Sequence, residues 1–428
     1  MGVIEEVLER IKPTPEEEEE ILGAAEDLLR SLRDRLPSNA EPMLVGSVAK
    51  GTFLRDADID VFVLFGDRPS KEEMGRVVWE ATEGLLEHRR MEYAEHPYVR
   101  GVFKGRNVDV VPCYRVPSAE QIISAVDRTP FHTTFVKENL PPEGRDEVRI
   151  LKQFAKGIGV YGSELKTMGF SGYLLELLVI KFGSFLGVLE AASKWGPKTV
   201  LWLGERRPKK EFPERLVFAD PTDPGRNAAA AVSETNYGLF ILASRDFLRS
   251  PTLDFFFPPP KEIRHHKRGT HYVEVSLPRP AVVEDVLYPQ IRKAVRSLIK
   301  CLEEDGFNPI DYEFDANGKV RILVEVERVV LPPVERHMGP PLWHPRALDF
   351  LNKWRDKALR GPYAQDGRLW VDRQRKITRI EEEVIKCAES ASWGKNLDEV
   401  KGGIEIIVDT PSPNLIEKYL SKKLRWIK

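Results

Sequence analysis

The chain has 428 residues, more than a single hydrophobic core usually supports, so we expect several domains. Lysine and arginine (65) nearly balance aspartate and glutamate (67), and the net charge of −2 excludes nucleic-acid binding through overall basicity; only a local basic face could do it. The most apolar long stretch, residues 173–189, contains Glu176, Lys181 and glycines, and is too broken for a membrane span. Cys113, Cys301 and Cys387 lack zinc or redox spacing, which favours a reducing, cytoplasmic setting.

The first third of the chain mixes helices and strands. Residues 3–36 predict two helices that are separated at residues 12–15, where Thr14 has the position of an N-cap. A short strand then enters a turn at Gly46. The pattern continues with a strand at 59–65, a helix at 70–88 and strands at 98–103 and 108–112. This order predicts an α/β or α+β sheet domain that ends near residue 135.

A proline cluster at residues 257–260 divides the remainder, as a linker would. Before it, helical periods cover residues 148–156, 171–192 and 227–248, with a charged insert at 198–217 that contains a short strand. After it, strands at 271–277 and 320–326 flank a helix at 289–304, and residues 335–428 mix helices with basic segments. The predicted fold class is therefore α+β and multidomain.

Two aspartates stand at the start of the strand at 59–65. Asp58 and Asp60 are two residues apart, so on a strand both carboxylates share a face and can bind one cation. A bare Asp-x-Asp is about equally consistent with a polar turn before a strand. An EF-hand loop that starts at Asp56 is excluded, because Val61 stands where the turn glycine is needed.

The residues before the aspartates favour a nucleoside triphosphate as the ligand. Gly46 lets the backbone come close to phosphates, while Ser47 and Lys50 can donate to their oxygens, in an arrangement that differs from the Walker A motif. Two cations that bracket an in-line displacement also need a carboxylate from a neighbouring strand, and Asp109 in the strand at 108–112 fits. We therefore predict that the catalytic metal ligands are Asp58, Asp60 and Asp109.

Gly46-Ser47, Asp58-x-Asp60 and Asp109 together resemble the polymerase-β-type nucleotidyltransferase superfamily. Further segments are similar to the archaeal (class I) CCA-adding tRNA nucleotidyltransferases, and they extend over most of the chain: residues 94–99, 108–114, 124–132, 169–176, 220–223, 226–227, 287–290 and 338–340. The resemblance implies a homodimer with a polymerase-β-like palm as its head, a helical neck that binds the base, an α/β body and a helical or mixed tail that bind tRNA. The corresponding boundaries are 1–137, 138–256 and 257–428.

The resemblance also implies the activity and its partners. Such an enzyme adds C, C and A to the tRNA 3′ end from CTP and ATP without a nucleic-acid template, repairs incomplete ends, uses two Mg²⁺ ions per site, releases pyrophosphate and contacts the acceptor and T arms. The family's triphosphate contacts fall on Ser47 and Lys50, where Arg is frequent in the family in place of Lys50. Its other nucleotide contacts fall on His132, Lys152 and Tyr161, and its base-reading arginine on Arg226.

Each of these last four residues also has a structural interpretation. His132 could cap a helix, Lys152 could lie on a solvated helix face, Tyr161 could pack in a glycine-flanked loop, and Arg226 could precede an alanine-rich helix at the surface. The guanidinium of Arg226 has donors only, which suits the acceptor edges of C and A and does not suit uracil N3–H. This chemistry supports a role for Arg226 in base selection.

Residues 346–379 are dense in Arg and Lys and contain Trp354, Tyr363 and Trp370; basic residues recur at 421–428. Such segments can track phosphates and stack on bases, although by composition alone a solvated face with core aromatics is the better interpretation. Two other functions stay open. One is a terminal nucleotidyltransferase of another specificity, such as a poly(A) or uridylyl transferase; the other is a non-catalytic RNA-binding protein on the same fold.

Overall fold

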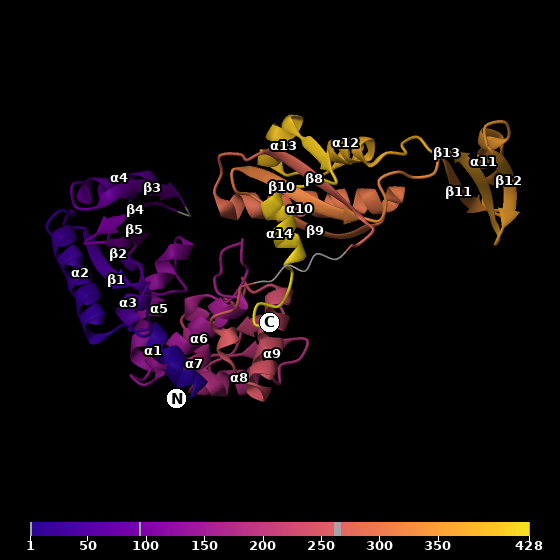
Figure 1. The fold of residues 1–428 in the computed structure, drawn as a ribbon. Helices are drawn as coiled ribbons and strands as arrows, with labels where there is room; N and C mark the ends of the chain where they lie inside the picture. Colours follow the sequence, from indigo (N-terminus) through magenta and orange to yellow (C-terminus); the bar gives the residue numbers. More distant parts are fainter. Residues whose placement is uncertain (1, 94–95, 261–266, 428) are drawn as a thin grey trace. The chain divides into compact units, whose positions relative to one another are not determined.

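The computed structural model describes residues 2–93, 96–260 and 267–427. The chain forms two compact units: unit 1 comprises Met1–Pro260 and Lys423–Lys428, and unit 2 comprises Lys261–Lys422 (Figure 1). Both units combine helices with sheets, so the predicted α+β, multidomain class is confirmed. The division at residues 137 and 256 stays a prediction. Residues 94–95 of one family-like segment and residues 261–266 after the proline cluster lie outside the described residues.

A five-stranded sheet opens unit 1, in the order β1-β2-β5-β4-β3. Its strands are β1 (Ala40–Val45), β2 (Ile59–Phe65), β3 (Glu87–Tyr93), β4 (Pro97–Phe103) and β5 (Arg106–Tyr114), of which β2 and β5 are parallel neighbours. Alternate residues of β2, among them Ile59 and Val61, are fully buried in a core shared with α2 (Pro15–Arg33) and α4 (Lys71–Ala81). Because side chains alternate along a strand, Asp60 lies on the opposite face.

Two boundaries of this region differ from the sequence prediction. Gly46 does not form an open turn but begins a short helix, α3 (Gly46–Lys50). The helix predicted to reach residue 88 ends at Ala81, because the Thr82 hydroxyl donates to the carbonyls of the preceding turn and Gly84 adopts a positive φ of 64°. The following residues form β3, an edge strand whose charged sequence has no hydrophobic alternation and was not predicted.

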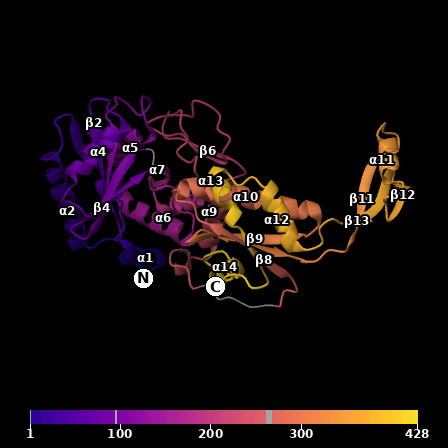
Figure 2. The same cartoon turned by 90° about the horizontal axis from the view of Figure 1, so that it is seen from above.

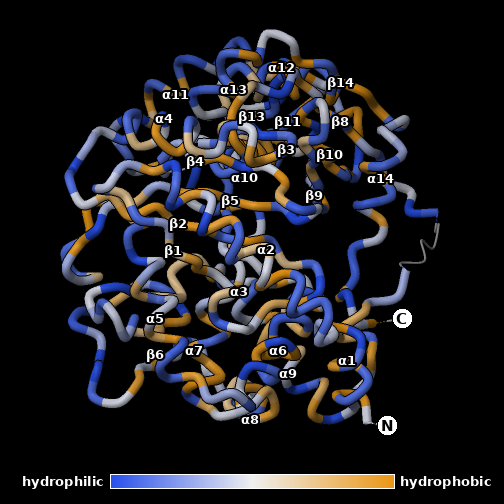
Figure 3. Tube along the Cα trace, turned by 90° about the vertical axis from the view of Figure 1, so that its left-hand side faces the viewer, coloured by the Kyte–Doolittle hydropathy of each residue, from blue (hydrophilic) through white to orange (hydrophobic). Residues whose placement is uncertain are grey.

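Helices make up most of the rest of unit 1: α1 (Val3–Ile11), α5 (Thr129–Asn139), α6 (Gly144–Ile158), α7 (Gly172–Phe182), α8 (Phe185–Ala192) and α9 (Glu234–Arg249). The small elements are β6 (Thr199–Leu201), β7 (Leu216–Phe218), η1 (Ala125–Arg128) and η2 (Leu253–Phe255). Their core is aromatic, with Phe154, Phe185, Phe240 and Phe247 buried in mutual edge contacts. Hydrophobic segments gather accordingly among α6, α8 and α9 (Figure 3).

Two predicted helices here were wrong in extent. Residues 171–192 form two helices, α7 and α8, because Gly183 adopts φ 84° and Ser184 caps a new helix. The helix predicted from residue 227 begins at Glu234, since the Asn227 side chain accepts the N–H groups of Phe218 and Ala229 and holds the alanine segment in turns. Within the described residues no single helix qualifies as a membrane span, although α7 and α8, bent by 92°, pass as a pair by length and composition.

Unit 2 contains a four-stranded sheet in the order β14-β8-β10-β9. The strands are β8 (His271–Pro278), β9 (Pro309–Asp315), β10 (Lys319–Val326) and β14 (Glu405–Val408). Its other elements are α10 (Glu284–Asp305), α12 (Ile380–Ser390), α13 (Lys395–Val400), η3 (Lys401–Gly403) and α14 (Pro413–Leu420). The main core lies between the sheet and α10, α12 and α13, while α14 packs through Leu415 and Tyr419 near Leu323 of β10.

A second, three-stranded sheet of unit 2 is joined to the rest by two chain segments (Figure 2). It consists of β11 (Val334–Pro341), β12 (Arg360–Gln365) and β13 (Arg368–Gln374), with α11 (Ala347–Trp354) against it. Unit 2 also corrects one prediction. A disulfide joins Cys301 of α10 to Cys387 of α12, whereas we expected reduced cysteines; the two are 86 residues apart, and only the packing of the helices brings them together.

Candidate active site

Two carboxylates of the predicted metal site lie side by side on neighbouring parallel strands. Asp60 on β2 is paired in register with Asp109 on β5, and Asp58 stands one residue before β2. Burial, together with the charges of Asp109 and Asp58, raises the pKa of Asp60 to about 7. The strand register thus places Asp60 beside Asp109, and Asp58 lies close enough for its charge to act on Asp60.

Asp109 has a partner that the sequence did not reveal. Arg100 lies opposite it on β4 and donates from Nε to Oδ1 at 2.6 Å and from NH2 to Oδ2 at 2.5 Å. Asn107 donates to Asp58 at 3.1 Å. Even with Arg100, the like charges keep the pKa of Asp60 raised, which is the electrostatic setting that a divalent cation relieves. The carboxylate set therefore fits divalent cations that prefer oxygen ligands, such as Mg²⁺.

Because Gly46 has no side chain, it leaves room for the Asp60 carboxylate as well as for a phosphate. Its φ is 71°, and a Cβ at this position would lie 2.1 Å from Asp60 Oδ2. Ser47 follows it in α3, which ends at Gly51 with φ 68°. A larger residue at position 46 would displace the Asp60 carboxylate, so the glycine has a structural reason that motif matching alone does not give.

Lys50 and Lys152 meet at one buried carboxylate. Lys50 Nζ donates to Glu176 Oε2 at 2.6 Å, and Lys152 Nζ lies 3.4 Å from Glu176 Oε1. Thr52 completes the cluster by donating to Glu176 at 2.6 Å and accepting from Lys152 at 3.0 Å. Burial lowers the pKa of Lys152 to about 8, and although burial opposes it, the two lysines hold the pKa of Glu176 below its usual value. Lys152 therefore lies in the interior and not on a solvated face.

Tyr161 lies beside this cluster. A Cβ at Gly172 would be 3.4 Å from the Tyr161 hydroxyl and 3.5 Å from Lys152 Cε, so both side chains reach the start of α7 at Gly172. Burial, and then the charges of Glu176, Asp56 and Asp60, raise the pKa of Tyr161 to about 12, so its hydroxyl stays a donor at neutral pH. Its surroundings agree with both the packing and the ligand-binding interpretation.

His132 and Arg226 converge on Asp220. The carboxylate of Asp220 is fully buried and contacts His132 Nε2 at 2.9 Å, Arg226 NH1 at 2.7 Å and the Tyr173 hydroxyl at 3.0 Å. The rings of His132 and Tyr173 are stacked 3.8 Å apart. His132 lies within α5, so it is not a helix cap, and Arg226 precedes turns and not a helix.

Burial and neighbouring groups determine the protonation states of His132 and Asp220 in this second cluster. Burial lowers the pKa of His132, so the ring is neutral near pH 7. Burial alone would raise the pKa of Asp220, but its partners His132, Thr222 and Arg226 hold it well below the usual range. Arg226 keeps a third of its side chain exposed, so its guanidinium has donors left for a ligand while Asp220 fixes its orientation.

Sequence reasoning missed the counter-charges of the site: Arg100, Glu176 and Asp220. Glu176 gave one signal, because a charge inside an otherwise apolar helix requires a partner. Asp220 lay in a family-like segment without an assigned role. Arg100 could be recognised only once β4 and β5 were paired.

Three families match consecutive parts of the chain: "Nucleotidyltransferase domain" (residues 25–132), "tRNA nucleotidyltransferase, second domain" (146–257) and "CCA-adding enzyme, C-terminal domain" (268–409). The CCA-adding enzyme of Picrophilus torridus is 39% identical over 417 residues, covering 96% of this chain and 97% of that protein. That of Thermoplasma acidophilum is 42% identical over 416 residues and covers 94% of each. Among solved structures, E. coli MS115-1 CdnC with ATP aligns at a TM-score of 0.47 with 19% identity, covering 60% of this chain and 92% of that one.

Proposed function

Because this chain belongs to the CCA-adding enzymes, we propose that Asp58, Asp60 and Asp109 are its catalytic metal ligands. The chain is a nucleotidyltransferase that adds CCA to the 3′ end of tRNA. The observation that supports the assignment best is the in-register pair Asp60 and Asp109, two half-buried carboxylates of like charge. Such a pair of carboxylates is suited to bind divalent cations.

Two Mg²⁺ ions held by these aspartates would supply Lewis-acid chemistry, lowering the pKa of the attacking 3′-hydroxyl and neutralising triphosphate charge. The chain's own residues orient the donor nucleotide. Lys50 uses one of its three N–H donors on Glu176, which leaves donors for a triphosphate. We propose that Gly46, Ser47, Lys152 and Tyr161 contact the same nucleotide. Catalysis then depends largely on positioning and electrostatic stabilisation.

We assign base selection to the second cluster. Asp220 holds Arg226 in one orientation, so that the guanidinium meets one edge of the base and favours bases with ring-nitrogen acceptors there, as C and A have, and the neutral His132 ring stacked on Tyr173 forms a flat boundary of the space. A fixed donor rejects uracil N3–H because two donors would face each other, leaving a buried polar group unpaired.

The function is tested with labelled tRNA that lacks its 3′ CCA, incubated with the chain, CTP, ATP and Mg²⁺. Extension should stop after three nucleotides, and it should stop after two when ATP is left out. Long homopolymer tails would instead indicate a poly(A) or uridylyl transferase. No extension with intact tRNA binding would indicate a non-catalytic RNA-binding protein.

Arg226→Ala is expected to impair discrimination more than triphosphate binding. We expect the preference for CTP over UTP, measured as a ratio of kcat/KM, to fall about 10–100-fold, which corresponds to one or two lost polar contacts. The matched control is Arg215→Ala, which removes an exposed arginine of the same unit paired with Glu234. Equal losses for all four nucleotides would contradict the assignment.

The raised pKa of Asp60 predicts a pH-dependent metal requirement. Below pH about 7 the carboxyl is protonated and must release its proton before it can bind a cation. The free Mg²⁺ concentration that gives half-maximal extension should therefore rise as pH falls, by about tenfold per unit below the pKa. Mg²⁺ titrations between about pH 8 and about pH 6 check this expectation. A requirement that is constant over this range would contradict it.

Several finer features remain proposals: the homodimer, the cytoplasmic setting, repair of incomplete ends and contact with the acceptor and T arms. In the basic region, Trp354 packs against Phe350 and His337, whereas the Arg336 guanidinium lies 3.9 Å above the Trp370 ring. Trp354 thus packs against its neighbours while it stays half-buried. Arg360 of β12 pairs with Asp372 but keeps 69% of its side chain exposed, and we propose that exposed basic residues of this region contact phosphates, so tRNA affinity should fall steeply with salt.

A further inference from the structure

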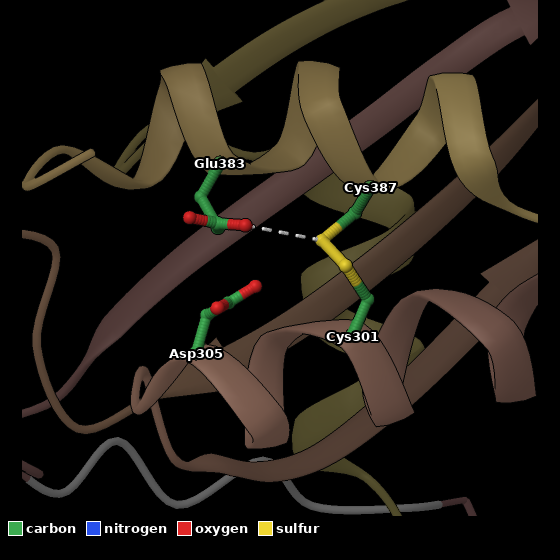
Figure 4. Close-up of side chains that lie close together, drawn as sticks. All are labelled: Cys301, Asp305, Glu383 and Cys387. Atoms are coloured by element: carbon green, nitrogen blue, oxygen red, sulfur yellow. Dashed lines mark hydrogen bonds between the residues drawn. A yellow bond between two sulfur atoms is a disulfide. The ribbon is translucent and has the colours of Figure 1, made fainter. Parts of the chain in front are cut away.

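Unit 2 contains a cluster of two cysteines and two carboxylates that is separate from the proposed nucleotide contacts. Helix α10 carries Cys301 and Asp305, and helix α12 carries Glu383 and Cys387, so each helix presents one sulfur and one carboxylate a single turn apart (Figure 4). The ligand atoms of these four residues all lie within 4.8 Å of one another. The paired arrangement directs four potential metal ligands from two rigid helices to one point.

Both carboxylates of this cluster form an ion pair with the same lysine, Lys386. Lys386 Nζ lies 2.5 Å from Asp305 Oδ2 and 2.7 Å from Glu383 Oε1. Glu383 is 2% exposed, and burial together with the neighbouring Asp305 raises its pKa. Lys386, by contrast, keeps 47% of its side chain exposed and can turn to solvent without unfolding the helix. The two neighbouring carboxylates therefore favour a positive charge between them, and the exposed Lys386 that supplies it now can be displaced.

We propose that, when Cys301 and Cys387 are reduced, they bind a divalent transition metal of the Zn²⁺ type together with Asp305 and Glu383. Two thiolates select zinc-like ions over Mg²⁺, and two carboxylates complete a four-ligand, closed tetrahedral set. Sulfurs that are bonded to each other are not thiolates, so the disulfide and the metal site are alternative states of the same pair. Either state links α10 to α12, and the metal site is a structural one.

The distance between Cys301 and Cys387 is compatible with both the disulfide and the metal-bound state. Their Cα atoms are 5.8 Å apart, and in a tetrahedral site with Zn–S bonds of about 2.3 Å the sulfurs are roughly 3.8 Å apart. Rotation about each Cα–Cβ bond supplies that separation. Glu383 Oε1 already lies 3.6 Å from Cys387 Sγ, as the dashed line in Figure 4 shows.

The test uses the full chain and Co²⁺ as a spectroscopic probe of thiolate ligation. A trialkylphosphine with water reduces the disulfide to two thiols and becomes the phosphine oxide, and it is removed before the titration. The reduced chain should develop a thiolate-to-cobalt charge-transfer band that saturates at one ion per chain and disappears when Zn²⁺ is added. The chain with its disulfide intact should give no such band.

Variants separate the cluster from other sites. Asp305→Asn should weaken the band-forming affinity at least about tenfold, since even an outer partner of a metal ligand is worth that much. Cys301→Ser should abolish the band, whereas Cys113→Ser, which removes the buried free cysteine of unit 1, should leave it unchanged. Circular dichroism shows whether each variant is folded, and Asp305 is partly exposed, so its replacement preserves the core. A reduced, folded chain without the band, or Asp305→Asn with unchanged affinity, would overturn the proposal.

Discussion

Replacement of Asp60 by asparagine is expected to slow incorporation of CMP and AMP about a thousandfold or more, since several kcal/mol of charge stabilisation depend on its metal ligation. Asparagine keeps the size of the side chain beside Gly46 and removes its charge. Single-turnover extension of tRNA with saturating nucleotide measures the effect. The fold should not be weakened, because burial and like charges already disfavour the ionised Asp60 carboxylate.

The matched control is Asp56→Asn, four residues earlier, in the turn that precedes β2. Asp56 has 74% of its side chain exposed and pairs with Lys156 at the surface, so its loss should change the rate less than about threefold. An Asp60→Asn enzyme within tenfold of the parent, or an equal loss at Asp56, would contradict the metal assignment. A parallel thermal melt separates loss of chemistry from loss of structure.

The second large effect is expected at Glu176. Replacing it with glutamine removes the carboxylate that both Lys50 and Lys152 face in the interior, and a buried ion pair that loses one partner costs about 3–5 kcal/mol. We expect the free energy of unfolding of unit 1 to fall by this amount, measured by chemical denaturation with hydrogen exchange in α6 and α7 as the reporter. Triphosphate affinity should fall as well, since Lys50 loses its fixed position.

The pH dependence gives this prediction a second readout. The folded pKa of Glu176 is below its unfolded value of 4.5, so its stabilising contribution is present above that pH and is lost as pH falls through the folded pKa. The difference between parent and Glu176→Gln should therefore shrink in acid. Glu190→Gln, an exposed position on α8, serves as the control and should stay within about 0.5 kcal/mol of the parent. A Glu176 variant as stable as that control would refute the role of the buried cluster.

Much of the catalytic strand could be predicted from the sequence. The apolar run after Asp58 located β2 at Ile59–Phe65 without error, because a continuous apolar segment of strand length is typical of a strand that packs on both faces. The Asp-x-Asp spacing then identified two side chains that share one face. Local periodicity and local spacing carry this information, and no distant contact is needed to read it.

The partners of the functional residues could not be predicted in the same way. Lys50 and Glu176 are 126 residues apart, and Cys301 and Cys387 are 86 residues apart, so their pairing follows only from how helices pack. The false helix start at Asn227 has a related cause. Alanine favours helices, but two backbone hydrogen bonds to the Asn227 side chain stabilise turns there instead.

The last residues of the chain return to unit 1. Trp426 stacks on Phe255 at 5.5 Å, and its indole N–H donates to Asp246 at 3.0 Å, which explains why Lys423–Lys428 belong to unit 1 although Lys261–Lys422 form unit 2. Unit 2 is thus an insertion with both ends fixed in unit 1. Unit 2 could therefore be removed as one piece. Joining Pro260 to Lys423 with a short linker would give a continuous unit 1 that keeps every proposed nucleotide contact and could be studied separately.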